Sequence, residues 1–369
     1  MDPHGSTAQR FPLVARFRPA CLPLPKRVRA LVDLADTAMT KTDQGVASSV
    51  YNQAALIASD LGLPDLARKM CHEHAAVYLR ACPLPAVSAI RGLEPVVNLA
   101  RLQIRGGHAD VGRQWLLDLY AAVEAGTPAR FGSVAIPADL TATDKDRHEV
   151  VAWLWRVLLA DGTRALTIQT RWTEALAHVE ALRGVGKRML DGRQVAVIAS
   201  LAAGDTAHAS ALLAETVPGE PWEQAVTACL TVLRHRAAGR PVDGPLADLA
   251  ASYLERAAEP GMTVFDIRLG LTVLDVMESV DLPAARRIVE DLHRRATETE
   301  DGYAARDNLA HPLFIELATD RQVRDCRALV RACALRTRTL PVRLRGELEA
   351  ALSAGGNVIR KSIAPSFCP

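Results

Sequence analysis

Aromatic side chains, lysines and long apolar runs are all scarce in this chain of 369 residues. Aromatic residues make up 4% of it, and only six of its 44 basic residues are lysines. The longest uninterrupted apolar run covers residues 150–155, which is too short to cross a membrane. The first thirty residues hold several arginines and prolines but no apolar stretch of the kind that a secretion signal needs. We therefore expect no membrane association and no secretion.

Paired cysteine motifs are also missing. The chain has seven cysteines, an odd number, and no C-x-x-C sequence occurs among them. A secreted disulfide scaffold would be shorter and richer in cysteine. We therefore expect reduced thiols in a cytoplasmic protein, most of them as small core residues. The seven positions are Cys21, Cys71, Cys82, Cys229, Cys326, Cys333 and Cys368.

Alanine is what the chain has in excess. There are 62 alanines, and hydrophobic residues reach 49%, which excludes a disordered chain. Apolar residues recur at intervals of three and four over most of the sequence, and these patterns end at stretches rich in proline and glycine. Alanine and leucine favour helices, whereas β-branched and aromatic runs are few. The sequence therefore predicts an all-α protein.

The charges nearly cancel over the whole chain but are unevenly distributed. The formal net charge is +2, with +5 on residues 1–31, +7 on residues 321–361 and −10 on the residues between them. We expect a basic N-terminal segment at 1–30, one helical repeat domain at 31–353 and a C-terminal tail at 354–369. A weak division of the domain is expected near 127–147, where the helical periodicity is poorest.

A short frame recurs along the chain, in which one helical pattern ends at a glycine or polar residue and a small residue follows five positions later. Two antiparallel helices in close contact need a tight turn between them and small side chains where they cross. The frame is carried by Ala55, Gly62 and Ala67, by Ala100, Gly107 and Gly112, by Gly204 and Ala209, and by Val280 with Ala285.

This frame resembles the tetratricopeptide repeat (TPR), and the resemblance covers about residues 45–300. In its general sequence pattern the chain is also similar to the helical sensor half of actinobacterial XRE-type regulators, but without their DNA-binding domain. The resemblance implies a TPR-like right-handed α-solenoid of antiparallel helix pairs. Such solenoids bind extended peptides on the concave side, which the first helix of each pair lines.

Candidate peptide-binding residues lie on these first helices. Asn98, Arg101 and Arg105 are spaced i, i+3 and i+7, which keeps them near one helix face. Asparagine amides can both donate to and accept from a peptide main chain, and arginine binds carboxylates. A solvated face with ordinary charges is the alternative. The complete candidate set is Asn52, Gln53, Asn98, Arg101, Arg105 and Arg164.

The matching positions of the later helix pairs are apolar. A groove that is polar at one end and apolar at the other would suit an amphipathic peptide, unless the C-terminal segment buries the apolar end. The apolar positions are Val195, Ile198, Leu271 and Leu274.

Four potential metal ligands follow one another at Cys71, His72, Glu73 and His74. Consecutive residues of a helix point about 100° apart, so these four side chains cannot converge on one ion. We interpret Cys71 and His74 as residues of a seam between two helices. No metal and no cofactor are predicted.

No phosphate-binding loop, dinucleotide fingerprint or G-x-S-x-G nucleophile motif is present. The sequence therefore favours a non-catalytic binding or scaffold protein that holds a peptide or a partner protein, as a sensor or as an accessory subunit of a peptide-modifying enzyme. Two alternatives stay open: an enzyme with an unrecognised site between helices, and a nucleic-acid-associated regulator that uses its basic ends. The oligomeric state is left open. The clearest basic stripe is Arg321, Arg324, Arg327 and Arg331.

Overall fold

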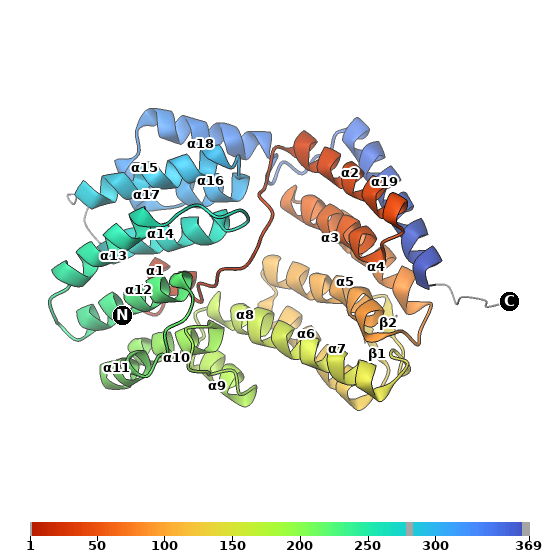
Figure 1. Ribbon diagram of the computed structural model, residues 1–369, viewed down its shortest axis with the longest axis horizontal. Coiled ribbons are helices and arrows are strands. Elements are labelled where there is room, and N and C mark those ends of the chain that lie inside the picture. Colours follow the sequence, from red (N-terminus) through yellow and green to blue (C-terminus); the bar gives the residue numbers. More distant parts are fainter. Residues whose placement is uncertain (1, 278–282, 364–369) are drawn as a thin grey trace. The chain divides into compact units, whose positions relative to one another are not determined.

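The computed structural model describes residues 2–277 and 283–363 (Figure 1). Helix makes up 72% of the structure and strand 2%, so the predicted all-α class is confirmed. Among the described residues, no helix is both long enough and apolar enough to cross a membrane. Val280 of the repeat frame lies outside the described residues, as do Cys368 and the end of the expected tail.

The chain forms two compact units, each built from two separate segments. Unit 1 comprises residues 1–23 and 166–333, and unit 2 comprises residues 24–165 and 334–369. The division near 165 differs from the one expected at 127–147. That stretch holds instead a small hairpin, in which β1 (Ala129–Phe131) pairs antiparallel with β2 (Val134–Ile136) through a turn at Gly132.

Unit 2 consists mainly of long helices connected by short turns. Its elements, besides the hairpin, are α2 (Leu24–Lys41), α3 (Gln44–Asp60), α4 (Pro64–Leu79), α5 (Ala86–Arg105), α6 (Ala109–Ala125), α7 (Asp144–Val157), the π-helical turn η1 (Leu158–Gly162), the start of α8 (Thr163–Thr167) and α19 (Val342–Ile363).

Local signals explain where these helices begin and end. The Asp43 carboxylate caps α3 by accepting hydrogen bonds from two main-chain amides of its first turn. Gly62 ends the α3 pattern with a φ of 77°, and Gly107 ends the α5 pattern with a φ of 87°. Both angles lie in the left-handed region, which glycine enters without strain. Gly204 has the same conformation in unit 1, so the three turn glycines of the repeat frame are alike.

The second half of α19 occupies the region that we expected to be a tail from residue 354. Gly355, Val358 and Ile359 are buried there, and α19 packs against α2 and α3. Glycine at 355 and 356 allows a close approach, because a side chain at 356 would lie 2.7 Å from the hydroxyl oxygen of Tyr51. This region, which we expected to be a tail, is therefore the part of α19 that packs closely against α3.

Unit 1 contains the remaining helices. They are α1 (Ser6–Arg10), the end of α8, α9 (Trp172–Ala181), α10 (Asp191–Ala202), α11 (Thr206–Ala214), α12 (Pro221–Ala237), α13 (Asp243–Glu255), α14 (Thr263–Met277), α15 (Pro283–Glu298), α16 (Gly302–Leu309), α17 (Pro312–Leu317) and α18 (Asp320–Ala332).

The N-terminal residues are part of the core of unit 1 and not a separate basic segment at 1–30. Phe11 and Leu13 are 2% and 1% exposed, and they pack in the same core cluster as α10, α12 and α14. Residues 11–23 run extended through the unit, and residues 24–30 begin α2 of unit 2. Two arginines of this stretch have partners within unit 1: Arg16 forms an ion pair with Asp191, and the Arg18 guanidinium lies 4.2 Å above the ring of Tyr303.

Candidate functional site

Three of the six candidate residues come together in unit 2. Asn52 is on α3, and Asn98 and Arg101 are one turn apart on α5. The Nδ2 of Asn98 donates to Oδ1 of Asn52 at 3.0 Å, and Nη1 of Arg101 donates to Oδ1 of Asn98 at 3.0 Å. The candidate set therefore contains three side chains that are direct neighbours in the structure.

Two acidic side chains extend this set at its ends. Asn52 donates through Nδ2 to Oε2 of Glu94 at 2.8 Å, and Arg101 donates through Nε and Nη2 to Oδ2 of Asp161 at 3.1 and 2.7 Å. The five residues form one continuous hydrogen-bonded row across α3, α5 and η1. We call Glu94, Asn52, Asn98, Arg101 and Asp161 the amide row.

The row is half-buried except at Arg101, which is its exposed member. Burial raises the pKa of Glu94, and the hydrogen bond from Asn52 opposes that rise. At the other end, Arg101 is 45% exposed while Asp161 is 16% exposed. An ion pair with one solvated partner contributes little to stability. The Arg101 guanidinium is therefore the part of the row most accessible to an anionic group.

Sequence reasoning missed Glu94 and Asp161. Glu94 had a usable signal, because it precedes Asn98 by four residues and so shares its helix face. Asp161 had none, since the π-helical turn that carries it leaves no recognisable pattern in the sequence. Such turns arise where one extra residue is inserted into an α-helix, and they are frequent at functional sites.

The other candidate residues lie near the row but outside it. Arg105 follows Arg101 by one turn of α5, is exposed, and donates through Nη1 to Oγ of Ser59 at 3.0 Å. Gln53 adjoins Asn52 on α3, but its side chain leaves the helix about 100° away from that of Asn52. Arg164 is an exposed residue of α8, three positions after Asp161.

The apolar positions predicted to continue the groove are buried in unit 1. Val195, Ile198, Leu271 and Leu274 are each 0% exposed. The N-terminal segment contributes to the core around them, through Phe11 and Leu13, where we had considered the C-terminal segment. These positions are packing residues in this structure and do not line a groove.

The neighbouring potential metal ligands point in different directions. His74 is 1% exposed, stacks on Tyr51 with ring centroids 4.9 Å apart and contacts Oγ of Ser48 at 3.2 Å, whereas Nδ1 of His72 lies 3.1 Å from Oγ of Ser133. Burial raises the pKa of the Cys71 thiol to about 12. In the described part of the chain, no three histidine, cysteine or acidic side chains are placed to share a metal ion.

The basic stripe of α18 lies on the surface of unit 1. Arg321, Arg324, Arg327 and Arg331 are exposed, and Asp325 on the same helix lies 3.9 Å from Arg321. The buried side of α18 carries Cys326. This arrangement is that of an amphipathic surface helix.

Asn98 has hydrogen-bonding capacity beyond its two bonds in the row. An asparagine amide can take part in four hydrogen bonds, two as donor and two as acceptor. The row uses one donor and one acceptor position of Asn98, so its amide can bind a further polar group. No protein-family model, curated protein or solved structure is significantly similar to this chain.

Proposed function

We propose that this chain is a non-catalytic peptide-binding protein and that the amide row is its peptide-binding site. The observation that carries the proposal is the direct bonding of Asn52 to Asn98 and of Asn98 to Arg101 across two helices. Two amides and a guanidinium in one row match the alternating donors and acceptors of an extended main chain. A single solvated helix face would not link side chains of α3 and α5 in this way.

The charges of the site favour a peptide with an acidic group at one end. Arg101 and Arg105 lie one turn apart on α5 and both are exposed. Arginine binds carboxylates through two parallel hydrogen bonds. A peptide carboxylate at this end would compete with Asp161 for Arg101, while Asn98 and Asn52 would bind the main chain that follows it.

We further propose that α3 to α7 form a short TPR-like right-handed array. The pairs α3–α4 and α5–α6 each turn through a left-handed glycine, and the first helices are in contact with one another, α3 with α5 and α5 with α7. In such an array the first helices line the concave side. The amide row lies on these first helices, which supports a peptide site in that position.

The test uses the full chain and a display library of random linear peptides with free C-termini. We expect wild-type protein to enrich a family of sequences, and synthetic peptides of that family to bind in fluorescence anisotropy. Replacement of Asn98, Arg101 and Arg105 by alanine should weaken this binding by about tenfold or more, since hydrogen bonds to charged groups contribute about 1.5–3 kcal/mol each. The melting temperature should change little, because Arg101 and Arg105 are exposed and Asn98 is only half-buried.

A matched control triple variant removes similar side chains from other faces of unit 2. Arg68 and Lys69 on α4 and Gln114 on α6 are at least partly exposed and lie outside the row. Their replacement by alanine should leave the affinity unchanged. Absence of any enriched sequence, or equal loss of binding in both triple variants, would contradict the proposal.

A further inference from the structure

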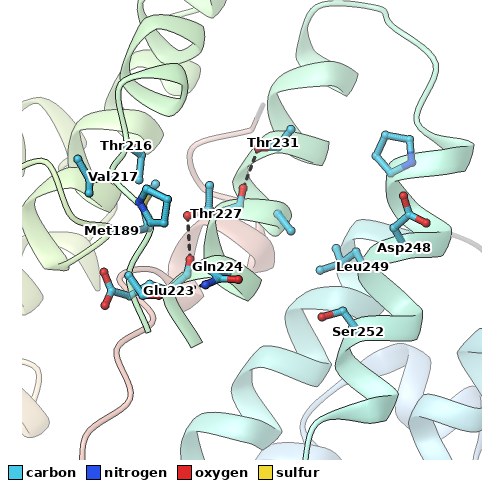
Figure 2. Close-up of a pocket in the computed structure, with 14 residues that line it drawn as sticks. Met189, Thr216, Val217, Glu223, Gln224, Thr227, Thr231, Asp248, Leu249 and Ser252 are labelled. Atoms are coloured by element: carbon cyan, nitrogen blue, oxygen red, sulfur yellow. Dashed lines mark hydrogen bonds between the residues drawn. The ribbon is translucent and has the colours of Figure 1, made fainter. Parts of the chain in front are cut away.

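Unit 1 contains a cavity of about 600 Å³ that the amide row does not involve. It lies over α12, between α13 on one side and the loop that precedes α12 on the other (Figure 2). Its apolar lining comes from Met189, Val217, Pro218, Ala228, Pro245 and Leu249. Volume and lining are in the range of small-molecule binding sites, which are mostly apolar with a few polar groups.

The threonine hydroxyl groups on α12 already use their protons in hydrogen bonds to carbonyl oxygens of the same helix. The hydroxyl of Thr227 donates to the Glu223 carbonyl oxygen at 2.8 Å, and that of Thr231 donates to the Thr227 carbonyl oxygen at 2.8 Å (Figure 2). Thr216 likewise donates to the Leu212 carbonyl oxygen at 2.8 Å. A hydroxyl group has one proton and two lone pairs. Toward a ligand, these threonines are therefore acceptors.

The amide of Gln224 can still both donate and accept. Its Nε2 donates to the Gly219 carbonyl oxygen at 3.1 Å, which leaves Oε1 as an acceptor and one further amide proton. Ser252 is the remaining lining residue with a hydroxyl proton. Acceptors therefore predominate on the polar part of the cavity wall.

Two carboxylates line the cavity, and they differ in how their charge is balanced. Glu223 is 1% exposed and accepts from Nε of Arg188 at 3.0 Å, an interaction that lowers its pKa. Asp248 is an exposed residue of α13 and faces the space opposite Thr231 (Figure 2). In the residues that the structure describes, no cation forms an ion pair with Asp248. None of the described residues that line the cavity is basic.

We propose that this cavity binds a primary ammonium group on an aliphatic chain. The ammonium pairs with the Asp248 carboxylate, on a cavity wall whose other polar groups are mainly acceptors. The aliphatic chain lies along Ala228 and Leu249 and extends toward Met189 and Val217. The proposal concerns unit 1 and does not depend on peptide binding by the amide row.

The test measures dissociation constants of the full chain by NMR titration. The probes are n-hexylamine, hexan-1-ol and hexanoate, which share the apolar chain and differ in the head group. We expect hexylamine to bind about tenfold or more tightly than the alcohol, and hexanoate to bind least, because a charged hydrogen bond is the main difference between them.

Two variants locate the binding site. Asp248→Asn keeps the shape of the side chain and should remove the preference for the amine, whereas Glu255→Gln, an exposed acid further along α13 and outside the cavity, should not. Ala228→Leu enlarges a side chain of the cavity lining and should weaken the binding of all three probes. Equal affinity for amine and alcohol, or an unchanged amine affinity in Asp248→Asn, would overturn the proposal.

The source of the ammonium group is decided by one more probe. An Nα-acetyl-lysine methylamide that binds as tightly as hexylamine would assign the site to a lysine side chain of a polypeptide. Weaker binding by the lysine derivative, with hexylamine binding retained, would assign it to a free aliphatic amine. Both results support an ammonium site, whereas failure of both amines to bind would overturn it.

Discussion

Gln194 binds both main-chain groups of Leu13, although the two residues are 181 positions apart in the sequence. The Leu13 amide donates to Oε1 of Gln194 at 2.6 Å, and Nε2 of Gln194 donates to the Leu13 carbonyl oxygen at 2.7 Å. A neighbouring β-strand would satisfy an extended residue in the same way. One buried side chain thus replaces a strand and holds the N-terminal segment in unit 1.

Replacement of Gln194 by leucine should destabilise unit 1 by about 3 kcal/mol or more. The Leu13 amide and carbonyl and the Met189 carbonyl would lose their partner, and each buried polar group left unbonded costs about 1–3 kcal/mol. The measurement is the free energy of unfolding in urea. Ser200→Ala on the same helix is the control, because that buried hydroxyl bonds only within its own helix, to the Ala196 carbonyl. A smaller loss for Gln194→Leu than for Ser200→Ala would refute this role of Gln194.

Gly112→Ala should destabilise unit 2 by about 1–3 kcal/mol, although alanine is the better helix former. A β-carbon at position 112 on α6 would lie 2.6 Å from the main-chain oxygen of Ala100 on α5, so the two helices would have to separate. Gly346 on α19 has no atom within 4 Å of such a β-carbon. Gly346→Ala should therefore raise the unfolding free energy by about 0.5–1 kcal/mol. Thermal unfolding of both variants measures the contrast, and effects of the same sign would argue against a close helix crossing at Gly112.

His74 should make the protein less stable as the pH falls below neutrality. Burial lowers the pKa of His74 from 6.5 to about 3. Between these values the unfolded chain binds a proton that the folded protein excludes, so acid favours unfolding. From pH 7 to pH 5 this histidine alone should remove about 2 kcal/mol of stability.

The check is urea unfolding of wild type and His74→Gln at both pH values. The variant has a lower stability at pH 7 but should lose about 2 kcal/mol less than wild type on acidification. His72→Gln, two positions earlier and only half-buried, serves as the control and should keep the wild-type pH response. An identical response in wild type and His74→Gln would show that His74 is not the buried neutral group described above.

The helix pairs could be predicted where their signals are local. Gly62, Gly107 and Gly204 marked turns because left-handed main-chain geometry selects glycine within a few residues of a helix end. The i, i+3, i+7 spacing of Asn98, Arg101 and Arg105 placed them on one face, because the helix repeat is also a local property of the sequence. Glu94 was within reach of this reasoning, as it lies on that stripe.

The remaining features depend on partners that are far away in the sequence. Nothing near Leu13 shows that Gln194 will satisfy its main chain, and nothing near Gly355 shows that Tyr51 will pack beside it. Proline and arginine near the N-terminus were therefore interpreted as a separate segment. Asp161 reached the amide row through a π-helical turn, and the composition of α7 gave no sign of that extra residue.

The assembly of each unit from two segments has a consequence for synthesis. Residues 1–23 leave the ribosome long before residues 166–333 exist, and α2 and α3 are made long before α19. Phe11 and Leu13 must therefore stay without their core until most of the chain has been made. In that interval the nascent chain exposes apolar sequence, so we expect it to be prone to aggregation until the helices of its core have been made.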